Sequence, residues 1–139
     1  MIVLDTNVVS ELLGARPASA VVRWVSAIEE DVAVTAMTLA ELRFGVRRLP
    51  DARRRTELEN GIARAIEPFE RKGLILSFDA DGARVFADVC ASRERIGRPI
   101  HTADAVIAAT CIANGAVLAT RNTKDFDGTG VRLIDPWTA

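Results

Sequence analysis

The sequence contains no tyrosine, one histidine and two cysteines, and its formal net charge is only −1. With so few aromatic residues, base stacking is not expected to dominate any nucleic-acid recognition. With almost no net charge, any contact with a polyanion must come from a local patch. Cys90 and Cys111 form no C-x-x-C pair and lie in alanine-rich apolar runs. We therefore expect buried, reduced thiols in a cytoplasmic protein.

Long hydrophobic runs are also missing. No apolar run approaches the roughly 18 residues that would cross a bilayer, so we expect no membrane association. The beginning, Met1 to Asp5, has no basic region and reaches an acid at once, unlike a signal peptide. Apolar residues make up 49% and charged residues 27% of 139 residues, without repeats or low-complexity tracts. This composition predicts one globular domain, residues 1–139.

Short apolar runs alternate with longer amphipathic ones, which predicts an α/β sandwich with a mainly parallel sheet of about five strands. The predicted strands are Ile2 to Leu4, Val32 to Thr35, Leu74 to Ser77, Val117 to Ala119 and Val131 to Ile134. The predicted helices are Val8 to Leu13, Ala18 to Ile28, Leu39 to Arg48, Ala52 to Phe69, Ala83 to Ile96 and Ala103 to Ala113. Pro68 and Pro99 are expected in connections.

Two acidic residues stand where a helix cap would also explain them. Asp5 directly follows the first predicted strand and precedes Thr6 and Asn7, residue types that suit a strand-to-helix turn. Glu41 ends the sequence Thr38-Leu39-Ala40-Glu41, which fits a capping box. Both acids therefore have a structural interpretation beside a functional one.

Asp104 is harder to explain by local structure alone. It lies in the first turn of a helix, Ala103 to Ala113, that is apolar nearly all round and should be buried. The helix dipole accommodates an acid at this place. However, Asp104 shares a helix face with Ala108 and Cys111, and a charge beside such a face needs a cation or hydrogen-bond donors.

The acids converge on one edge of the predicted sheet. Asp5, the Glu41 helix and the segment Thr120 to Asp125 each follow a strand at its carboxyl end, and Asp104 opens the helix that leads into the fourth strand. Ligands of open parallel sheets bind beyond these carboxyl ends. Carboxylates brought together repel one another unless a divalent cation neutralises them. All-oxygen ligands without cysteine or histidine indicate Mg²⁺ or Mn²⁺.

Five segments together resemble the PIN-domain ribonucleases, specifically VapC toxins of the FitB-like branch. They are Met1 to Glu11, Ala40 to Gly45, Ile100 to Ala109, Leu118 to Phe126 and Ile134 to Trp137. These segments span the chain in order, and their combination is specific although no single piece is. The resemblance implies a three-layer α/β/α fold and metal-dependent endoribonuclease activity. It also implies a homodimeric toxin that is restrained by a small antitoxin protein and meets DNA only through that antitoxin.

The resemblance also assigns roles to residues. The family's active-site positions fall on Asp5, Glu41 and Asp104. Asp5 and Asp104 would bind Mg²⁺, or Mn²⁺ in its place, and Glu41 would act from the first or second coordination shell. The residues that would brace the site are Thr6, Asn7 and Thr120.

At one position the chain departs from the pattern. Many relatives have an acid where this chain has Asn122. Asn122 can still hold a metal-bound water. We favour Asp125 as the substitute for the missing charge, because it follows the predicted strand closely enough to fold back over the site. Either Glu41 or Asp125 could accept the proton of the attacking water. The departure puts a second metal site in doubt and leaves the first intact.

For RNA binding, the arginine-rich stretch after Glu41 is the candidate. A solvated helix face is the usual meaning of such a run, but its nearness to Glu41 favours phosphate contacts. The candidates are Arg43, Arg47 and Arg48. The single histidine, His101, cannot supply the paired acid and base of a metal-free ribonuclease, which further favours metal chemistry.

Other classes fit less well. A haloacid-dehalogenase-like phosphatase needs a second Asp where Asn7 stands, and a receiver-type signalling domain needs a lysine at the end of its last strand, where neither Lys72 nor Lys124 is well placed. The alternative that stays open is a degenerate, non-catalytic PIN-like domain that binds RNA or a protein partner.

Overall fold

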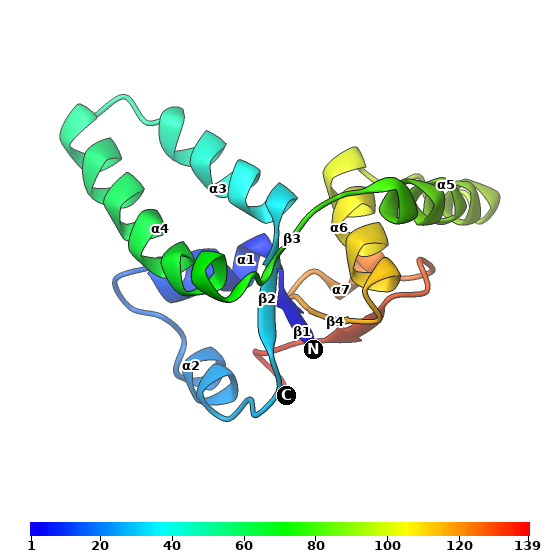
Figure 1. The fold of residues 1–139 in the computed structure, drawn as a ribbon, viewed down its shortest axis with the longest axis horizontal. Helices are drawn as coiled ribbons and strands as arrows, with labels where there is room; N and C mark the ends of the chain where they lie inside the picture. Colours follow the sequence, from blue (N-terminus) through cyan, green and yellow to red (C-terminus); the bar gives the residue numbers. More distant parts are fainter.

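A sheet of five parallel strands forms the centre of the molecule (Figure 1). The structure is a computed structural model and describes residues 1–139. The strand order is β3-β2-β1-β4-β5. The strands are β1 (Ile2–Leu4), β2 (Val32–Thr35), β3 (Ile75–Leu76), β4 (Val117–Ala119) and β5 (Arg132–Ile134). Strands are added on one side of β1 up to β3 and on its other side from β4 on, so the topological switch point lies between β1 and β4. Ligands of such sheets bind at this point.

Seven helices connect and cover the strands. They are α1 (Thr6–Leu13), α2 (Ser19–Ser26), α3 (Ala36–Arg47), α4 (Ala52–Lys72), α5 (Ala80–Arg95), α6 (Thr102–Ala113) and α7 (Thr123–Phe126). The six helices expected from the sequence are present, with ends displaced by a few residues. The short helix α7 was not expected, because four residues are too few to produce a helical hydrophobic period.

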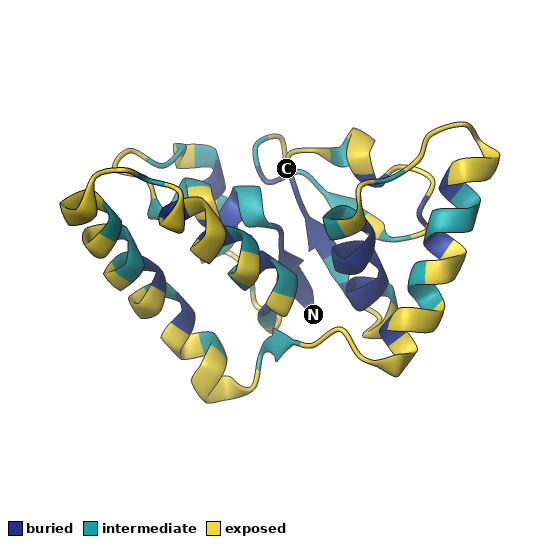
Figure 2. Cartoon of the chain, turned by 90° about the horizontal axis from the view of Figure 1, so that it is seen from above, coloured by how far each residue is buried: buried dark blue, intermediate teal, exposed yellow.

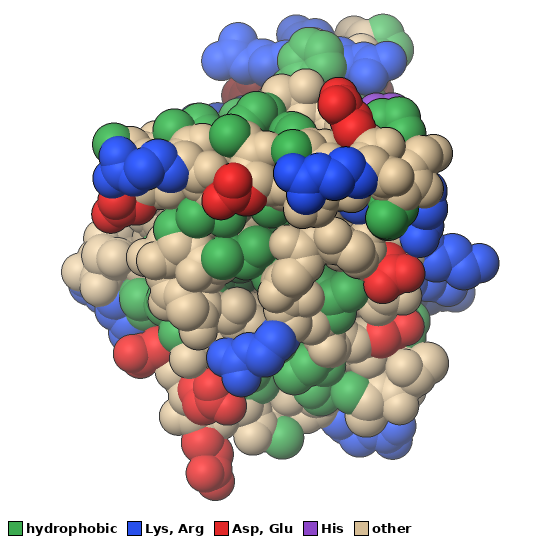
Figure 3. Space-filling view, turned by 90° about the vertical axis from the view of Figure 1, so that its right-hand side faces the viewer, with side chains coloured by type: hydrophobic (Ala, Val, Ile, Leu, Met, Phe, Trp, Pro, Cys, Tyr) green, Lys and Arg blue, Asp and Glu red, His purple; other side chains and the backbone are tan.

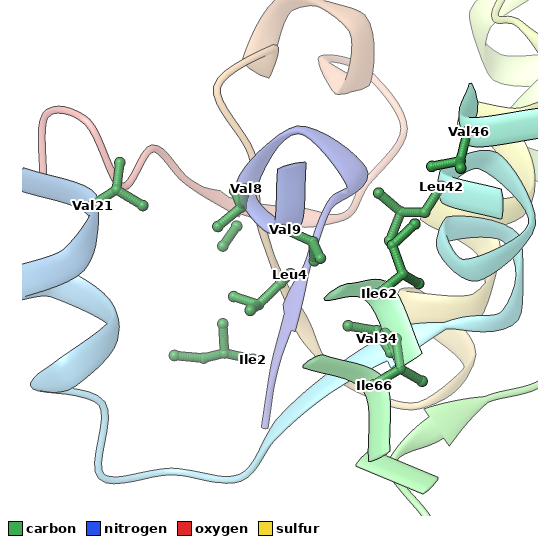
Figure 4. Packing of buried hydrophobic residues seen from close by; sticks show 11 residues of the cluster. Ile2, Leu4, Val8, Val9, Val21, Val34, Leu42, Val46, Ile62 and Ile66 are labelled. Atoms are coloured by element: carbon green, nitrogen blue, oxygen red, sulfur yellow. The ribbon is translucent and has the colours of Figure 1, made fainter. Parts of the chain in front are cut away.

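The side chains of each strand alternate between two hydrophobic cores. Ile2 and Leu4 point into one core, which also receives residues of α1, α2, α3 and α4. Val3 points into the other, formed with α5, α6 and α7. The three-layer α/β/α prediction is therefore confirmed. Figure 4 shows the first core, where Leu4 and Val34 of the sheet lie among side chains of α1, α3 and α4.

Burial follows this layering. Figure 2 shows buried residues along the central strands and on α6, whereas the outer sides of α4 and α5 are exposed. The apolar helix α6 is buried from Ala105 to Cys111, as its composition predicts. Acidic and basic side chains are interspersed on the face shown in Figure 3. No helix is long and apolar enough to span a bilayer.

Three local expectations were wrong. Pro68 lies inside α4 rather than in a connection; it is exposed, while Ile62, Ile66 and Phe69 keep packing on the core across it. The strand expected over 74–77 is only Ile75–Leu76. The capping box ending at Glu41 does not exist, because α3 begins at Ala36 with Thr35 as its N-cap.

Candidate active site

Asp5 is held at the end of β1 by hydrogen bonds from three sides. It is buried and caps α1, so the cap interpretation is correct and coexists with a place in the site. Its Oδ1 accepts from the Thr6 backbone N–H (2.9 Å), and its Oδ2 accepts from Thr120 Oγ1 (2.7 Å) and Asn7 Nδ2 (3.1 Å). Burial raises the pKa of Asp5 above its ordinary value, and the charge of Glu41 adds to this, while the three hydrogen bonds act in the opposite direction.

The sheet register explains why these partners meet. Leu4 of β1 is paired with Ala119 of β4, so the next residues, Asp5 and Thr120, leave the sheet side by side. Asn7, in the first turn of α1, donates to both Asp5 and Thr120, each at 3.1 Å. The predicted bracing residues therefore do contact Asp5.

Glu41 reaches the same place from α3. Thr35 ends β2 and caps α3, where its Oγ1 accepts from the Thr38 backbone N–H at 3.0 Å. Glu41, in the second turn, accepts a 2.7 Å hydrogen bond at Oε1 from Thr6 Oγ1. The Thr38 hydroxyl, fully buried, lies 3.1 Å from Thr6 Oγ1. Threonine hydroxyls thus connect the ends of β1 and β2 to this carboxylate, and Thr35 and Thr38 are contributors that the sequence prediction missed.

Asp104 enters from the opposite layer, in the first turn of α6. Burial, and after it the negative charges of Asp5, Asp125 and Glu41, together raise the pKa of Asp104 to about 6, with His101 acting in the opposite direction. The protein thus places several carboxylates close enough together for each to oppose the ionisation of another.

Asp5, Glu41 and Asp104 line one cleft of about 490 Å³ at the carboxyl edge of the sheet, whereas Thr120 contacts Asp5 without lining the cleft. Its lining residues are Asp5, Thr6, Asn7, Ser10, Glu11, Glu41, Asp104, Arg121, Asn122 and Trp137. Four of them were not among the sequence candidates: Ser10, Glu11, Arg121 and Trp137. Arg121 could have been suspected from its position next to Thr120. Trp137 lies in the resembling segment Ile134 to Trp137, but no acid or helix start beside it indicated a place in the site, and only the packing of the chain after β5 brings it to the cleft.

The two candidates for the missing acid have different locations. Asn122 lines the cleft, and its backbone N–H donates to Thr120 Oγ1 at 3.1 Å. Asp125 is exposed on α7 and does not line the cleft, although it is near enough for its charge to raise the pKa of Asp104.

The three arginines proposed for RNA binding lie outside the cleft. Arg43 and Arg47 border a smaller cavity of about 190 Å³ between α3 and α4, where Arg47 forms an exposed ion pair with Glu59 (3.3 Å). Arg48 lies over the ring of Phe44, 5.4 Å from its centroid. His101 is exposed before α6 and does not line the cleft. The role of the three arginines stays a prediction.

The carboxylates fit a hydrated divalent cation better than a bare one. No group of three or more Asp, Glu, His or Cys side chains is close enough together to hold a metal ion by itself. Mg²⁺ usually retains several waters and uses only one or two protein carboxylates. The donor set is all oxygen, and its mutual repulsion would be relieved by a cation. The fold and cleft thus define an α/β protein with an acidic site suited to Mg²⁺.

Comparison with known proteins shows the family to which this chain belongs. The family profile described as PIN domain matches residues 2–131, and the chain belongs to the PIN domain family. VapC ribonuclease Y4jK of Sinorhizobium fredii is 44% identical over 138 residues, which cover 99% of this chain and 98% of that protein. Toxin FitB of Neisseria gonorrhoeae is 39% identical over 138 residues, 99% of each chain.

Solved structures agree with this placement. The crystal structure of FitAcB from Neisseria gonorrhoeae superposes with a TM-score of 0.90 at 38% identity and covers both chains completely. The structure of VapBC-5 from Mycobacterium tuberculosis, a member of the VapBC family of toxin–antitoxin systems, gives a TM-score of 0.70 at 25% identity over 95% of this chain and 94% of that chain. The predicted family is therefore confirmed.

Proposed function

We propose that this chain is a Mg²⁺-dependent endoribonuclease, with Mn²⁺ as a substitute, and the toxin of a toxin–antitoxin pair. The observation that carries the proposal is the meeting of Asp5, Glu41 and Asp104, from three separate segments, in one cleft at the carboxyl edge of the sheet. Full-length similarity to relatives named ribonuclease and toxin supports both parts of the proposal.

Asp5 and Asp104 would hold the metal ion. Asp5 is already oriented by Thr6, Asn7 and Thr120, so it needs little reorganisation to bind a cation. When bound, Mg²⁺ would offset charge on the phosphate and lower the pKa of the attacking water. The pKa of Asp104, raised to about 6, leaves this carboxylate ionised near pH 7.5 yet sensitive to mild acid.

Glu41 would accept a proton from the attacking water. The Thr6 hydroxyl bonds to its Oε1 and fixes the side chain, which leaves Oε2 available for a proton. Water attacks phosphorus, the bond from phosphorus to the 3′ oxygen breaks, and that oxygen takes up a proton. The products therefore carry 5′-phosphate and 3′-hydroxyl ends.

The test is cleavage of a single-stranded or loop RNA by the purified chain. Activity should require Mg²⁺ or Mn²⁺, disappear in EDTA and return when metal is added back. Undiminished activity in EDTA, or products with 2′,3′-cyclic phosphate ends, would contradict the mechanism. RNA binding without cleavage in Mg²⁺ would favour the degenerate binding domain instead.

The partner proposal has its own tests. A short reading frame beside this gene should encode an antitoxin with a DNA-binding segment. The two proteins should copurify, and the complex should lack the nuclease activity of the isolated chain. DNA would be bound only by the pair. The expected homodimer can be checked by sedimentation of the isolated chain, for which a monomer at micromolar concentration would be the contrary result.

A further inference from the structure

Arg121 is the only Lys or Arg that lines the acidic cleft. Four acids line the same space: Asp5, Glu11, Glu41 and Asp104. An arginine in such surroundings would be expected to pair with one of them. Yet none of the ion pairs of the molecule involves Arg121. Its charge is therefore free to meet a ligand.

Arg121 contacts Trp137 rather than an acid. The guanidinium carbon lies over the Trp137 ring, 5.1 Å from its centroid, a favourable cation–π geometry. The ring packs against the core on the α1 side of the sheet, and the Trp137 backbone N–H donates to Asp135 Oδ1 at 2.9 Å. The indole is thus a fixed support that holds the guanidinium at the wall of the cleft.

Arg121 is also tied to the carboxylate network through its backbone. Its N–H donates to Asn7 Oδ1 at 3.2 Å, while the amide nitrogen of Asn7 donates to Asp5. Asn7 therefore contacts both Asp5 and Arg121. These two hydrogen bonds couple the position of the Arg121 backbone to the position of the Asp5 carboxylate.

An RNA strand that enters this cleft meets four acids, so its phosphates need a positive partner at the wall. A guanidinium with one face on an indole still presents its N–H edge for bidentate contact with phosphate oxygens. We propose that Arg121 binds a backbone phosphate of the RNA next to the scissile one, and that Trp137 is the positioning residue that keeps Arg121 out of the acids. This inference rests on RNA being the substrate, as proposed above.

The first experiment measures binding without turnover. Chains carrying Asp104→Asn bind a labelled single-stranded RNA oligonucleotide in EDTA over a range of NaCl concentrations. Adding Arg121→Gln should weaken binding about 10-fold and reduce the slope of log affinity against log salt by about 0.7, the loss of one phosphate contact. Arg132→Gln is the matched control. Arg132 is exposed at the amino end of β5, away from the carboxyl edge of the sheet where the cleft lies, so this substitution should change neither the affinity nor the salt slope.

The second experiment separates Trp137 from Arg121. Trp137→Ala should weaken binding and lower the salt slope as Arg121→Gln does, because the freed guanidinium can pair with the acids. Trp137→Phe should keep most of the RNA affinity and most of the salt slope, since a phenyl ring also supports a cation. Arg121→Lys should keep the salt slope but recover only part of the affinity, because an ammonium is not bidentate. Thermal unfolding verifies that each variant is folded.

Kinetics in Mg²⁺ complete the test. Arg121→Gln should raise KM by about 10-fold with a much smaller change in kcat. An unchanged KM and an unchanged salt slope in a folded Arg121→Gln variant would overturn the inference, as would a parent chain that does not bind RNA. If RNA binds in an Arg121-dependent way but is never cleaved, the nuclease proposal fails while the phosphate contact stands.

Discussion

The Thr120 hydroxyl donates a 2.7 Å hydrogen bond to Oδ2 of Asp5, and the two residues are 115 positions apart in the chain. They lie at the ends of β4 and β1, neighbouring parallel strands in the middle of the sheet. The bond is buried, so a loss of this donor is not made good by water. Asp5 therefore owes part of its orientation to a residue far away in the sequence.

Removal of that donor should damage the site without changing the fold. We expect Thr120→Val to lower kcat/KM and apparent Mg²⁺ affinity by about 10- to 100-fold, as removal of residues that orient a metal ligand commonly does. Thr120→Ser keeps the hydroxyl and should stay within a few-fold of the parent. Magnesium titrations of nuclease activity measure both. Equal activity in Thr120→Val would show that Asp5 needs no such bond.

Asp104→Asn should abolish activity and stabilise the metal-free chain. Removal of a ligand should cost roughly 1000-fold in kcat. At pH 7.5 the substitution removes a buried charge that is repelled by other carboxylates. Because Asp104 is only half-buried, we expect the free energy of unfolding to rise by about 1 kcal/mol, which corresponds to a rise in Tm of about 3 °C. Asp5→Asn should also be inactive. Thermal unfolding in EDTA decides the stability part, and an unchanged or lower Tm at pH 7.5 would contradict it.

The pH dependence of stability follows from the same shift. The pKa of Asp104 is about 6 in the folded chain against an ordinary 3.8. Protonation of this group therefore favours folding; its contribution is fully present below pH 3.8 and is lost as the pH rises through 6. The Tm advantage of Asp104→Asn over the parent should consequently shrink between pH 7.5 and pH 5.5. Scans at both pH values in EDTA, with Asp88→Asn as an exposed control on α5, measure it.

Glu41→Gln tests the proton acceptor. The substitution keeps an oxygen for the Thr6 hydroxyl but removes the group that would take the proton. We expect kcat to fall by about 100-fold, with little change in RNA affinity. Stopped assays at saturating RNA and Mg²⁺ give kcat directly. Parent-like kcat would leave Glu41 without a role in the chemistry.

Asn122 and Asp125 give opposite forecasts. If Asn122 weakens a second metal site, Asn122→Asp should raise activity at low Mg²⁺ several-fold, because a carboxylate binds a hard dication better than an amide. If Asp125 already supplies that charge, Asp125→Asn should instead reduce activity. The cleft position of Asn122 and the exposed position of Asp125 favour the first outcome. Parent-like metal dependence in both variants would leave Asp5, Glu41 and Asp104 as the only contributors.

Much of the fold could be predicted because local patterns determine it. The short apolar runs Ile2–Leu4 and Val117–Ala119 are typical of buried strands, and the longer apolar run of α6 is typical of a buried helix. Helix ends were less accurate, because a cap such as Thr35 is recognised only once its side chain is seen to accept a backbone N–H. Pro68 was misplaced because packing of the residues on both sides of it outweighs its local preference.

The sequence alone determined which acids stand at the ends of strands and helices, since residue type and hydrophobic period are local properties. Only the tertiary structure decided which of them share a space. Parallel pairing of β1 with β4 joins Asp5 to Thr120, whereas Arg43, close in sequence to Glu41, faces another cavity. The C-terminal Trp137 reaches the cleft and supports Arg121 for the same reason. Contacts between distant segments arise from how helices and strands pack, and a local pattern carries no record of that packing.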